Sequence, residues 1–183
     1  MNFLQPIAIL CAAFLVVFLE FAFNGVRSLL GAQIDLLPAL IVYASLSAGL
    51  PTMTLLAVLG GLGYDSLSAN PLGVSVLPLF LIGLVLHQNR ELVIREQPYA
   101  QIVLGFIASA AAPALTLLLL VNAGAEPLFG WKSLWQWLVM SVGGALSTPL
   151  WFRLFDGFNR AFAYQPLPET SFRSDRQIKR GRA

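Results

Sequence analysis

The positions of the charged residues constrain this chain more than any other feature. Five stretches contain no Asp, Glu, Lys or Arg, and they are 19, 29, 24, 29 and 20 residues long. A helix that crosses a bilayer needs about 20 mainly apolar residues. Each stretch is therefore long enough for at least one membrane-spanning helix. The stretches are 1–19, 36–64, 66–89, 97–125 and 133–152.

The composition also indicates that the chain lies in a lipid bilayer. Apolar residues make up 57% of the chain and charged residues 11%, whereas a soluble domain carries about 25% charge. These values exclude an ordinary soluble enzyme and a disordered chain. A single cysteine, Cys11, excludes an internal disulfide framework. We therefore predict an all-α, polytopic membrane helix bundle.

The second charge-free stretch is too long for one straight span. Its 29 residues would form a helix of roughly 44 Å, longer than the ~30 Å bilayer core. Gly49 suits a helix end and Pro51 suits the first turn of the next helix. We therefore predict a hairpin and about six spans, with five spans and one long kinked helix as the alternative. The six spans are about 4–25, 36–49, 51–65, 72–88, 98–121 and 134–155.

The basic residues predict the orientation. Arg90 and Arg95 lie in one short connection, whereas the connection 66–71 has no basic residue. Because cytoplasmic loops are enriched in Lys and Arg, six spans place both termini in the cytoplasm of a cell whose plasma (inner) membrane holds the chain. The start of the chain lacks the basic residues of a signal peptide, so we expect the first span to be retained.

The end of the chain differs from the rest in composition. Residues 1–156 are expected to form the transmembrane bundle, and residues 157–183 a basic, disordered cytoplasmic tail. The tail has six basic and two acidic residues, a net charge of +4. Attraction to anionic membrane lipid explains this charge better than nucleic-acid binding does, because the tail lacks a folded nucleic-acid-binding motif and aromatic residues regularly interleaved with its basic residues.

The sequence offers little catalytic chemistry. It has one histidine, His87, and one cysteine, Cys11, and they lie on different predicted spans. No His, Cys or carboxylate group has metal-ligand spacing, and no phosphate-binding glycine loop is present. We therefore expect no enzymatic activity, no cofactor and no metal.

Two acidic positions lie near predicted helix ends. Asp35 precedes the second span, where it can cap free N–H groups, and Pro38 is tolerated in the first turn. Glu20 is the deepest charge of the first span, with Arg27 two turns further along the same face. Capping and an interface-level acid are the structural interpretations of these residues. Docking of a partner protein is the alternative for Asp35, and pairing with a partner or a role in a transport pathway is the alternative for Glu20.

Asp65 is harder to explain. It closes a predicted helix, where a negative charge opposes the helix dipole. We expect it to find a partner, either hydrogen bonds from Ser66 and Ser68, which would stabilise the turn, or a cation elsewhere, through functional or intersubunit pairing. Asn70 and Pro71 are expected to cap and start the next helix, and Gly73 follows them.

Small residues recur at four-residue spacing, which lets helices approach closely in lipid. Packing within this chain is the structural interpretation, and binding of another membrane protein is the alternative. Pro113 is expected to kink its span. The small-residue pairs are Ala57 with Gly61, Gly105 with Ser109, Ser141 with Ala145, Gly143 with Ser147, and Gly144 with Thr148.

The ordered set of these features resembles the MreD family of rod shape-determining membrane proteins. The resemblance is best over 35–120, and Asp65 to Gly73 is its most distinctive part. The chain departs from the family at 110–113, where Ala-Ala-Ala-Pro replaces a region that often holds an acid. The elements are Asp35-Leu36-Leu37-Pro38, Tyr43, Gly60-Gly61-Leu62, Asp65-Ser66-Leu67-Ser68 with Pro71-Leu72-Gly73, the connection 89–98 with Gln101, and Pro149-Leu150-Trp151-Phe152-Arg153.

The resemblance implies a fold similar to the six-helix substrate-binding component of energy-coupling vitamin transporters. It implies a non-catalytic scaffold of the cell-elongation complex, which binds an MreC-like protein and helps to organise peptidoglycan synthesis. MreB, RodA and a penicillin-binding transpeptidase are the further partners implied. Carried onto this chain, the partner-binding residues are Asp35, Pro38, Asp65, Ser68, Pro71, Gly73, Glu20 and Arg27.

Two other function classes remain open at this stage. One is the substrate-binding component of a vitamin-type transporter, which predicts a polar cavity between helices. The other is a membrane enzyme acting on lipid or cell-wall precursors, which predicts that substitution of Asp65, Glu20 or His87 lowers turnover.

Overall fold

The described part of the chain forms six helices. The computed structural model describes residues 4–22, 31–68, 70–93, 97–124 and 130–162, and within these ranges no β-strand occurs. The all-helical prediction is therefore confirmed for the described part of the chain. The helices are α1 (Leu4–Ala22), α3 (Leu37–Ser47), α4 (Leu50–Leu67), α5 (Val76–Gln88), α6 (Pro98–Asn122) and α7 (Trp131–Phe162).

The predicted break in the second charge-free stretch is confirmed. α3 ends at Ser47 and α4 begins at Leu50, with Pro51 in its first turn. Gly49 has an extended backbone (φ −77°, ψ 159°), so the helical path stops there. The two helices pack against each other, which excludes the alternative of one long kinked helix.

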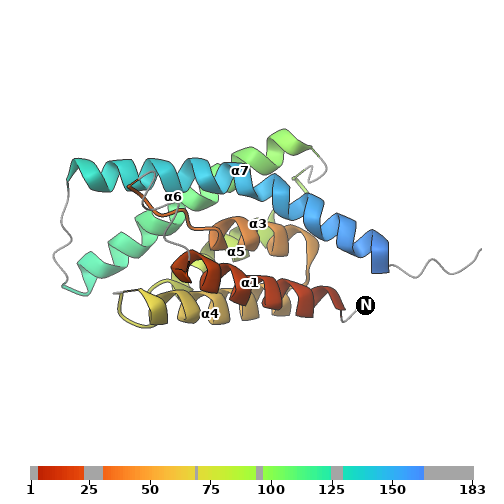
Figure 1. Cartoon of the computed structure of the whole chain (residues 1–183), viewed down its shortest axis with the longest axis horizontal. Coiled ribbons are helices and arrows are strands. Elements are labelled where there is room, and N and C mark those ends of the chain that lie inside the picture. Colours follow the sequence, from red (N-terminus) through yellow and green to blue (C-terminus); the bar gives the residue numbers. More distant parts are fainter. Residues whose placement is uncertain (1–3, 23–30, 69, 94–96, 125–129, 163–183) are drawn as a thin grey trace, which may run out of the picture.

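α3 is the centre of the bundle. It packs against all five other helices, and ten of its eleven residues are buried. Figure 1 shows it between α6 and α7 on one side and α1 and α4 on the other. A helix that is apolar on all sides is stable only when every side meets apolar neighbours. α3 is 11 residues long, about 16 Å.

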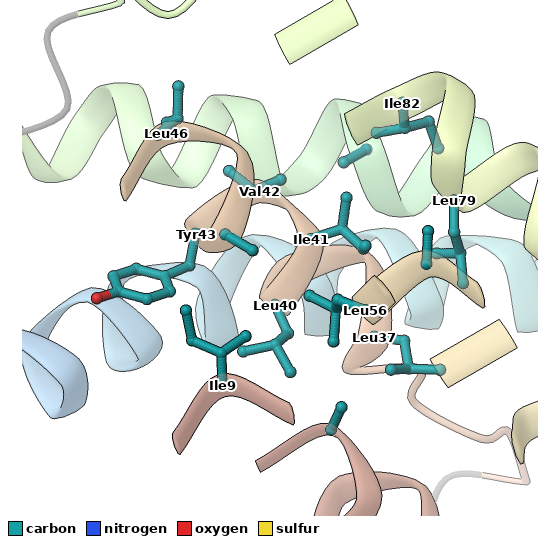
Figure 2. Packing of buried hydrophobic residues seen from close by; sticks show 14 of the residues in the cluster. Ile9, Leu37, Leu40, Ile41, Val42, Tyr43, Leu46, Leu56, Leu79 and Ile82 are labelled. Atoms are coloured by element: carbon teal, nitrogen blue, oxygen red, sulfur yellow. The ribbon is translucent and has the colours of Figure 1, made fainter. Parts of the chain in front are cut away.

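Side chains from the surrounding helices converge on α3. In Figure 2, Ile9 of α1, Leu56 of α4, and Leu79 and Ile82 of α5 lie around the α3 side chains. Tyr43 of α3 stacks on Phe155 of α7 with ring centroids 4.6 Å apart. The core of the bundle is therefore built on α3 and consists of contacts between residues distant in sequence.

The apolar exterior suits a bilayer. α1, α6 and α7 are long and apolar enough to cross a membrane, whereas α3 and α5 are shorter apolar helices. Large apolar side chains are exposed on the outer faces of the helices that surround α3, which is typical of contact with lipid. The chain is therefore a membrane protein. Examples of exposed side chains are Phe14 (77%), Leu146 (62%), Leu150 (62%) and Leu59 (54%).

The bundle has two distinct ends. At one end, called the Asp65 end, α1, α4 and α6 finish and α3, α5 and α7 begin. At the other, called the Arg90 end, α1 begins and α7 finishes (Figure 1). The connection after α5, which holds Arg90 and Glu91, lies beside the turn between α3 and α4 at this second end.

Small residues allow the closest helix approaches, and these lie within this chain. A Cβ atom on Gly61 of α4 would lie 2.9 Å from the backbone of Val76 in α5. Where α6 crosses α7, a Cβ on Gly105 would collide with Thr148, and one on Gly144 would collide with Ser109. The small-residue faces therefore serve intramolecular packing, as their structural interpretation predicts.

Two predicted boundaries are wrong. α5 begins at Val76 rather than near residue 72. α7 extends to Phe162, so residues 157–162, assigned to the tail, continue the last helix. Pro149 lies inside α7 without ending it. The predicted tail from residue 163 onward lies outside the described residues.

Candidate functional site

Asp65 organises the turn between α4 and α5. Its carboxylate accepts three hydrogen bonds: from the N–H of Gly73 (2.9 Å), from the N–H of Ser75 (3.0 Å) and from the hydroxyl of Ser75 (2.5 Å). Asp65 is 1% exposed. The carboxylate therefore holds the turn from inside and explains why a charge can lie at this helix end.

The predicted partners of Asp65 make other bonds. Ser66 donates its hydroxyl proton to the carbonyl of Gly63, and Ser68 donates to the backbone carbonyl of Asp65. The carboxylate is bonded by Gly73 and Ser75 instead. Turn stabilisation, one of the two predicted alternatives, is what these contacts show within the chain.

Asn70 and Pro71 do not start α5, which corrects the prediction. The N–H of Asn70 bonds to the Ser68 hydroxyl (3.3 Å), and Pro71 is exposed in a turn. Gly73 has φ +90°, which a helix cannot contain. Because Asp65 draws in the N–H groups of Gly73 and Ser75, the helix begins only at Val76.

Glu20 and Asp35 meet at the start of α3. The Glu20 carboxylate accepts the N–H of Leu36 (2.6 Å), and the Asp35 carboxylate accepts the N–H of Leu37 (2.9 Å). Both bonds satisfy N–H groups that a helix leaves free at its start. The capping role predicted for Asp35 is thereby confirmed, although Leu36 is formally the N-cap residue. Pro38 is buried in this first turn.

The surroundings of Asp35 change its acidity. It is 8% exposed, and burial raises its pKa to about 6. Its hydrogen bond from Leu37 acts in the opposite direction. Desolvation outweighs the hydrogen bond because a buried carboxylate loses most of its hydration.

A cavity with both polar and apolar lining lies beside Asp35. Its volume is about 200 Å³, and residues of α3, α4, α5, α6 and α7 line it. Its polar wall comes from the loop before α3, the end of α4, the turn before α5 and the middle of α6. The polar lining residues are Asp35, Tyr64, Asn70, Ser75 and Thr116.

A pair of glutamines fixes the segment before α3. The N–H of Gln33 donates to the Gln136 side-chain oxygen (3.0 Å), and the Gln136 amide donates back to the Gln33 carbonyl (2.8 Å). These residues are 103 positions apart. The pair ties a non-helical segment to α7, which satisfies backbone groups that lipid cannot.

The structure separates the predicted site residues into two groups. Asp65, Ser68, Pro71 and Gly73 lie in one turn. Glu20, Asp35 and Pro38 lie together at the start of α3. Arg27 lies outside the described residues.

Sequence reasoning missed Ser75, Tyr64 and the Gln33–Gln136 pair. Ser75 is the residue before α5, and its hydroxyl makes the shortest hydrogen bond to Asp65. A serine just before an apolar run is a helix-start signal, and it could have placed the start of α5 correctly. The glutamines carry no comparable local signal, since their partners are distant in sequence.

Several elements of the family resemblance contact one another. Tyr43 of α3 meets Phe152 of the closing Pro149 to Arg153 element edge to face, with ring centroids 5.1 Å apart. A Cβ on Gly60 would lie 3.0 Å from Leu37. These positions therefore have internal packing roles.

His87 and Cys11 lie apart from this region. His87 Nδ1 lies 3.0 Å from the carbonyl oxygen of Ser45, which joins α5 to α3 at the Arg90 end. Cys11 is exposed on α1. Within the described residues, no group of three or more His, Cys, Asp or Glu side chains could hold a metal ion.

Comparison with protein-family models, curated proteins and solved structures found no significant match for the chain.

Proposed function

We propose that the protein is a non-catalytic membrane scaffold of the cell-elongation complex, which binds an MreC-like protein and helps to organise peptidoglycan synthesis. MreB, RodA and a penicillin-binding transpeptidase are the proposed further members of the complex. The observation that carries the proposal is the Asp65 turn. The most distinctive element of the MreD resemblance, Asp65 to Gly73, forms one internally braced turn at the end of the bundle.

The braced turn suits contact with a partner. Its tip carries Pro71 and Leu72 on the surface, and Leu72 is 71% exposed. A turn held by a buried carboxylate loses little conformational entropy on binding, so an apolar tip of this kind makes an efficient contact. Asp65 then acts by positioning the tip rather than by touching the partner, because it is buried.

The proposal includes six membrane crossings in the plasma membrane with both termini in the cytoplasm. α1 begins and α7 ends at the Arg90 end (Figure 1). Arg90 lies in the connection at this end, and Arg153 and Arg160 lie in the later part of α7, which ends there. Basic residues favour the cytoplasmic side of a membrane. The Asp65 end then faces outward, where an outer domain of an MreC-like protein is accessible.

A substrate-binding component of a vitamin-type transporter is the alternative. The cavity beside Asp35 is the feature that favours ligand binding, since side chains of five helices or adjoining loops line it. Its volume of about 200 Å³ is below the roughly 300–1,000 Å³ of pockets that bind drug-sized ligands. Thermal shifts across a vitamin panel separate the alternatives: a saturable rise in melting temperature favours the transporter component.

Co-purification in mild detergent tests the scaffold. The full chain is co-expressed with an MreC-like protein, and Leu72→Asn is compared with Leu92→Asn. Leu92 is a matched control because it is equally apolar, 82% exposed and near the Arg90 end. We expect recovery of the partner with the wild type and the control, and at least about fivefold less with Leu72→Asn, the loss of one apolar contact of roughly 1 kcal/mol.

Two results contradict the proposal. Recovery of the wild-type chain without any MreC-like partner removes the scaffold function. Equal recovery with both leucine variants removes the Asp65 turn as the contact.

A further inference from the structure

A second surface feature lies outside the Asp65 turn. α6 and α7 are packed tightly where Gly105 and Ser109 meet Gly144 and Thr148. Figure 1 shows the two helices crossing there and spreading apart toward the start of α7. Between the spread halves lies an open groove of about 840 Å³.

The groove is apolar along its length. Its walls are Pro113, Ala114 and Leu117 from α6, and Leu134, Trp137 and Met140 from α7. Trp137 is held in place by a hydrogen bond from its indole N–H to the carbonyl of Ala110 (2.8 Å). The wall is therefore ordered, and its exposed surface is hydrocarbon.

One cation stands at the mouth of the groove. Lys132 is the single charged residue among the described residues that line it. Lys132 lies in the first turn of α7, where no acidic residue is present. A cation there opposes the helix dipole, whereas an anion is favoured. The helix itself thus does not explain the position of Lys132.

Gln136, a polar residue in the lining, has its side chain already paired within the protein. The Gln136 amide both donates to and accepts from the Gln33 backbone. The groove therefore combines one positive end, formed by Lys132 and the helix start, with a hydrocarbon channel that runs from it along α6 and α7.

We infer that this groove binds one anionic phospholipid, with its phosphate at Lys132 and the start of α7 and an acyl chain between α6 and α7. Charge complementarity selects the occupant. An anionic headgroup pairs with Lys132 and with the positive end of the helix dipole, and the acyl chain covers the apolar walls. A zwitterionic lipid places an additional cation beside Lys132 and binds less well. The inference does not depend on the identity of the partner protein.

Tryptophan quenching by brominated lipids tests this site. Trp131, Trp135 and Trp151 are changed to phenylalanine, so that Trp137 in the groove wall reports alone. The protein is reconstituted into nanodiscs of phosphatidylcholine that contain increasing fractions of brominated phosphatidylglycerol or brominated phosphatidylcholine. Because one cation near the membrane surface contributes about 1 kcal/mol, we expect half-maximal quenching at an about fivefold lower fraction of the anionic lipid.

Charge variants identify the residue responsible. Lys132→Gln is expected to abolish the preference for phosphatidylglycerol, whereas Lys132→Arg retains it. Arg153→Gln is the matched control, since Arg153 is an exposed cation on the same helix but away from the groove. It is expected to leave the preference unchanged.

Three results overturn the inference. Equal quenching by both lipids in the wild type means that bulk lipid covers the groove. A preference that survives Lys132→Gln means that another group selects the lipid. No quenching of Trp137 by either lipid means that a second copy of this chain covers the groove, and cross-linking then detects it.

Discussion

The two ends of the bundle use charge in opposite ways. At the Asp65 end, Asp35 and Asp65 are buried, and they and Glu20 accept backbone hydrogen bonds. At the other end, Arg90 and its neighbour in sequence Glu91 are exposed. Buried carboxylates thus hold the structure together at one end, whereas the charged residues of the connection after α5 are exposed at the other.

The lengths of the helices explain this difference. α3 and α5 have 11 and 13 residues, about 16 and 20 Å, and both begin at the Asp65 end. Their first N–H groups therefore lie inside the bundle, where water cannot satisfy them. Carboxylates accept hydrogen bonds from these groups: Glu20 and Asp35 at the start of α3, and Asp65 in the turn into α5.

The largest expected effect comes from breaking the Asp65 turn. Asp65→Ala leaves the N–H groups of Gly73 and Ser75 and the Ser75 hydroxyl without their acceptor. We expect the free energy of unfolding to fall by about 3 kcal/mol, the cost of several unsatisfied buried groups. Thermal unfolding in detergent measures it, with Asp156→Ala as the control because Asp156 is exposed on α7. Equal melting temperatures for the two variants contradict the buried role of Asp65.

A smaller effect is expected from pH. Burial raises the pKa of Asp35 from 3.8 to about 6, so the folded chain holds this proton more tightly than the unfolded chain. The stabilising contribution of Asp35 is therefore fully present below pH 4 and is lost as the pH rises through 6. The contribution of Asp35 is on the order of 2 kcal/mol between pH 4 and 7. Melting temperatures of the wild type and Asp35→Asn measure it.

The asparagine variant cannot titrate, so its melting temperature is expected to vary less over this range than that of the wild type. Identical pH profiles contradict the assignment to Asp35.

The smallest effect is expected at Glu20. Glu20→Leu removes the acceptor of the Leu36 N–H and is expected to lower the free energy of unfolding by about 1 kcal/mol. Glu20→Gln retains an acceptor oxygen and removes the charge beside Asp35, so it is expected to match or exceed the wild type. Exposed Glu91→Gln at the Arg90 end serves as control. A loss with Glu20→Gln as large as with Glu20→Leu shows that the negative charge itself is required.

Local sequence signals were sufficient to predict helix boundaries that depend only on the backbone preferences of nearby residues. The break at Gly49 and Pro51 and the start of α6 at Pro98 follow from backbone preferences that a neighbour cannot change. The start of α5 was misplaced because Asn70 and Pro71 form a good local helix start. The distant Asp65 carboxylate outweighs that preference by engaging Gly73 and Ser75.

The candidate site was only partly predictable. The sequence identified the candidate residues. It also indicated that Asp65 needs a partner, because this negative charge lies at the end of a helix. Its actual partners, and the bonds from Glu20 to Leu36 and from Gln33 to Gln136, connect segments that the chain brings together only on folding.

The spacing of charges by itself determined that this chain is a bundle of apolar helices, because hydrocarbon tolerates neither unpaired charge nor unpaired backbone. The tertiary structure decided which helix is central and which charges are internal. α3 occupies the centre because five helices can surround a short apolar helix, and that burial is what gives Glu20, Asp35 and Asp65 their backbone partners.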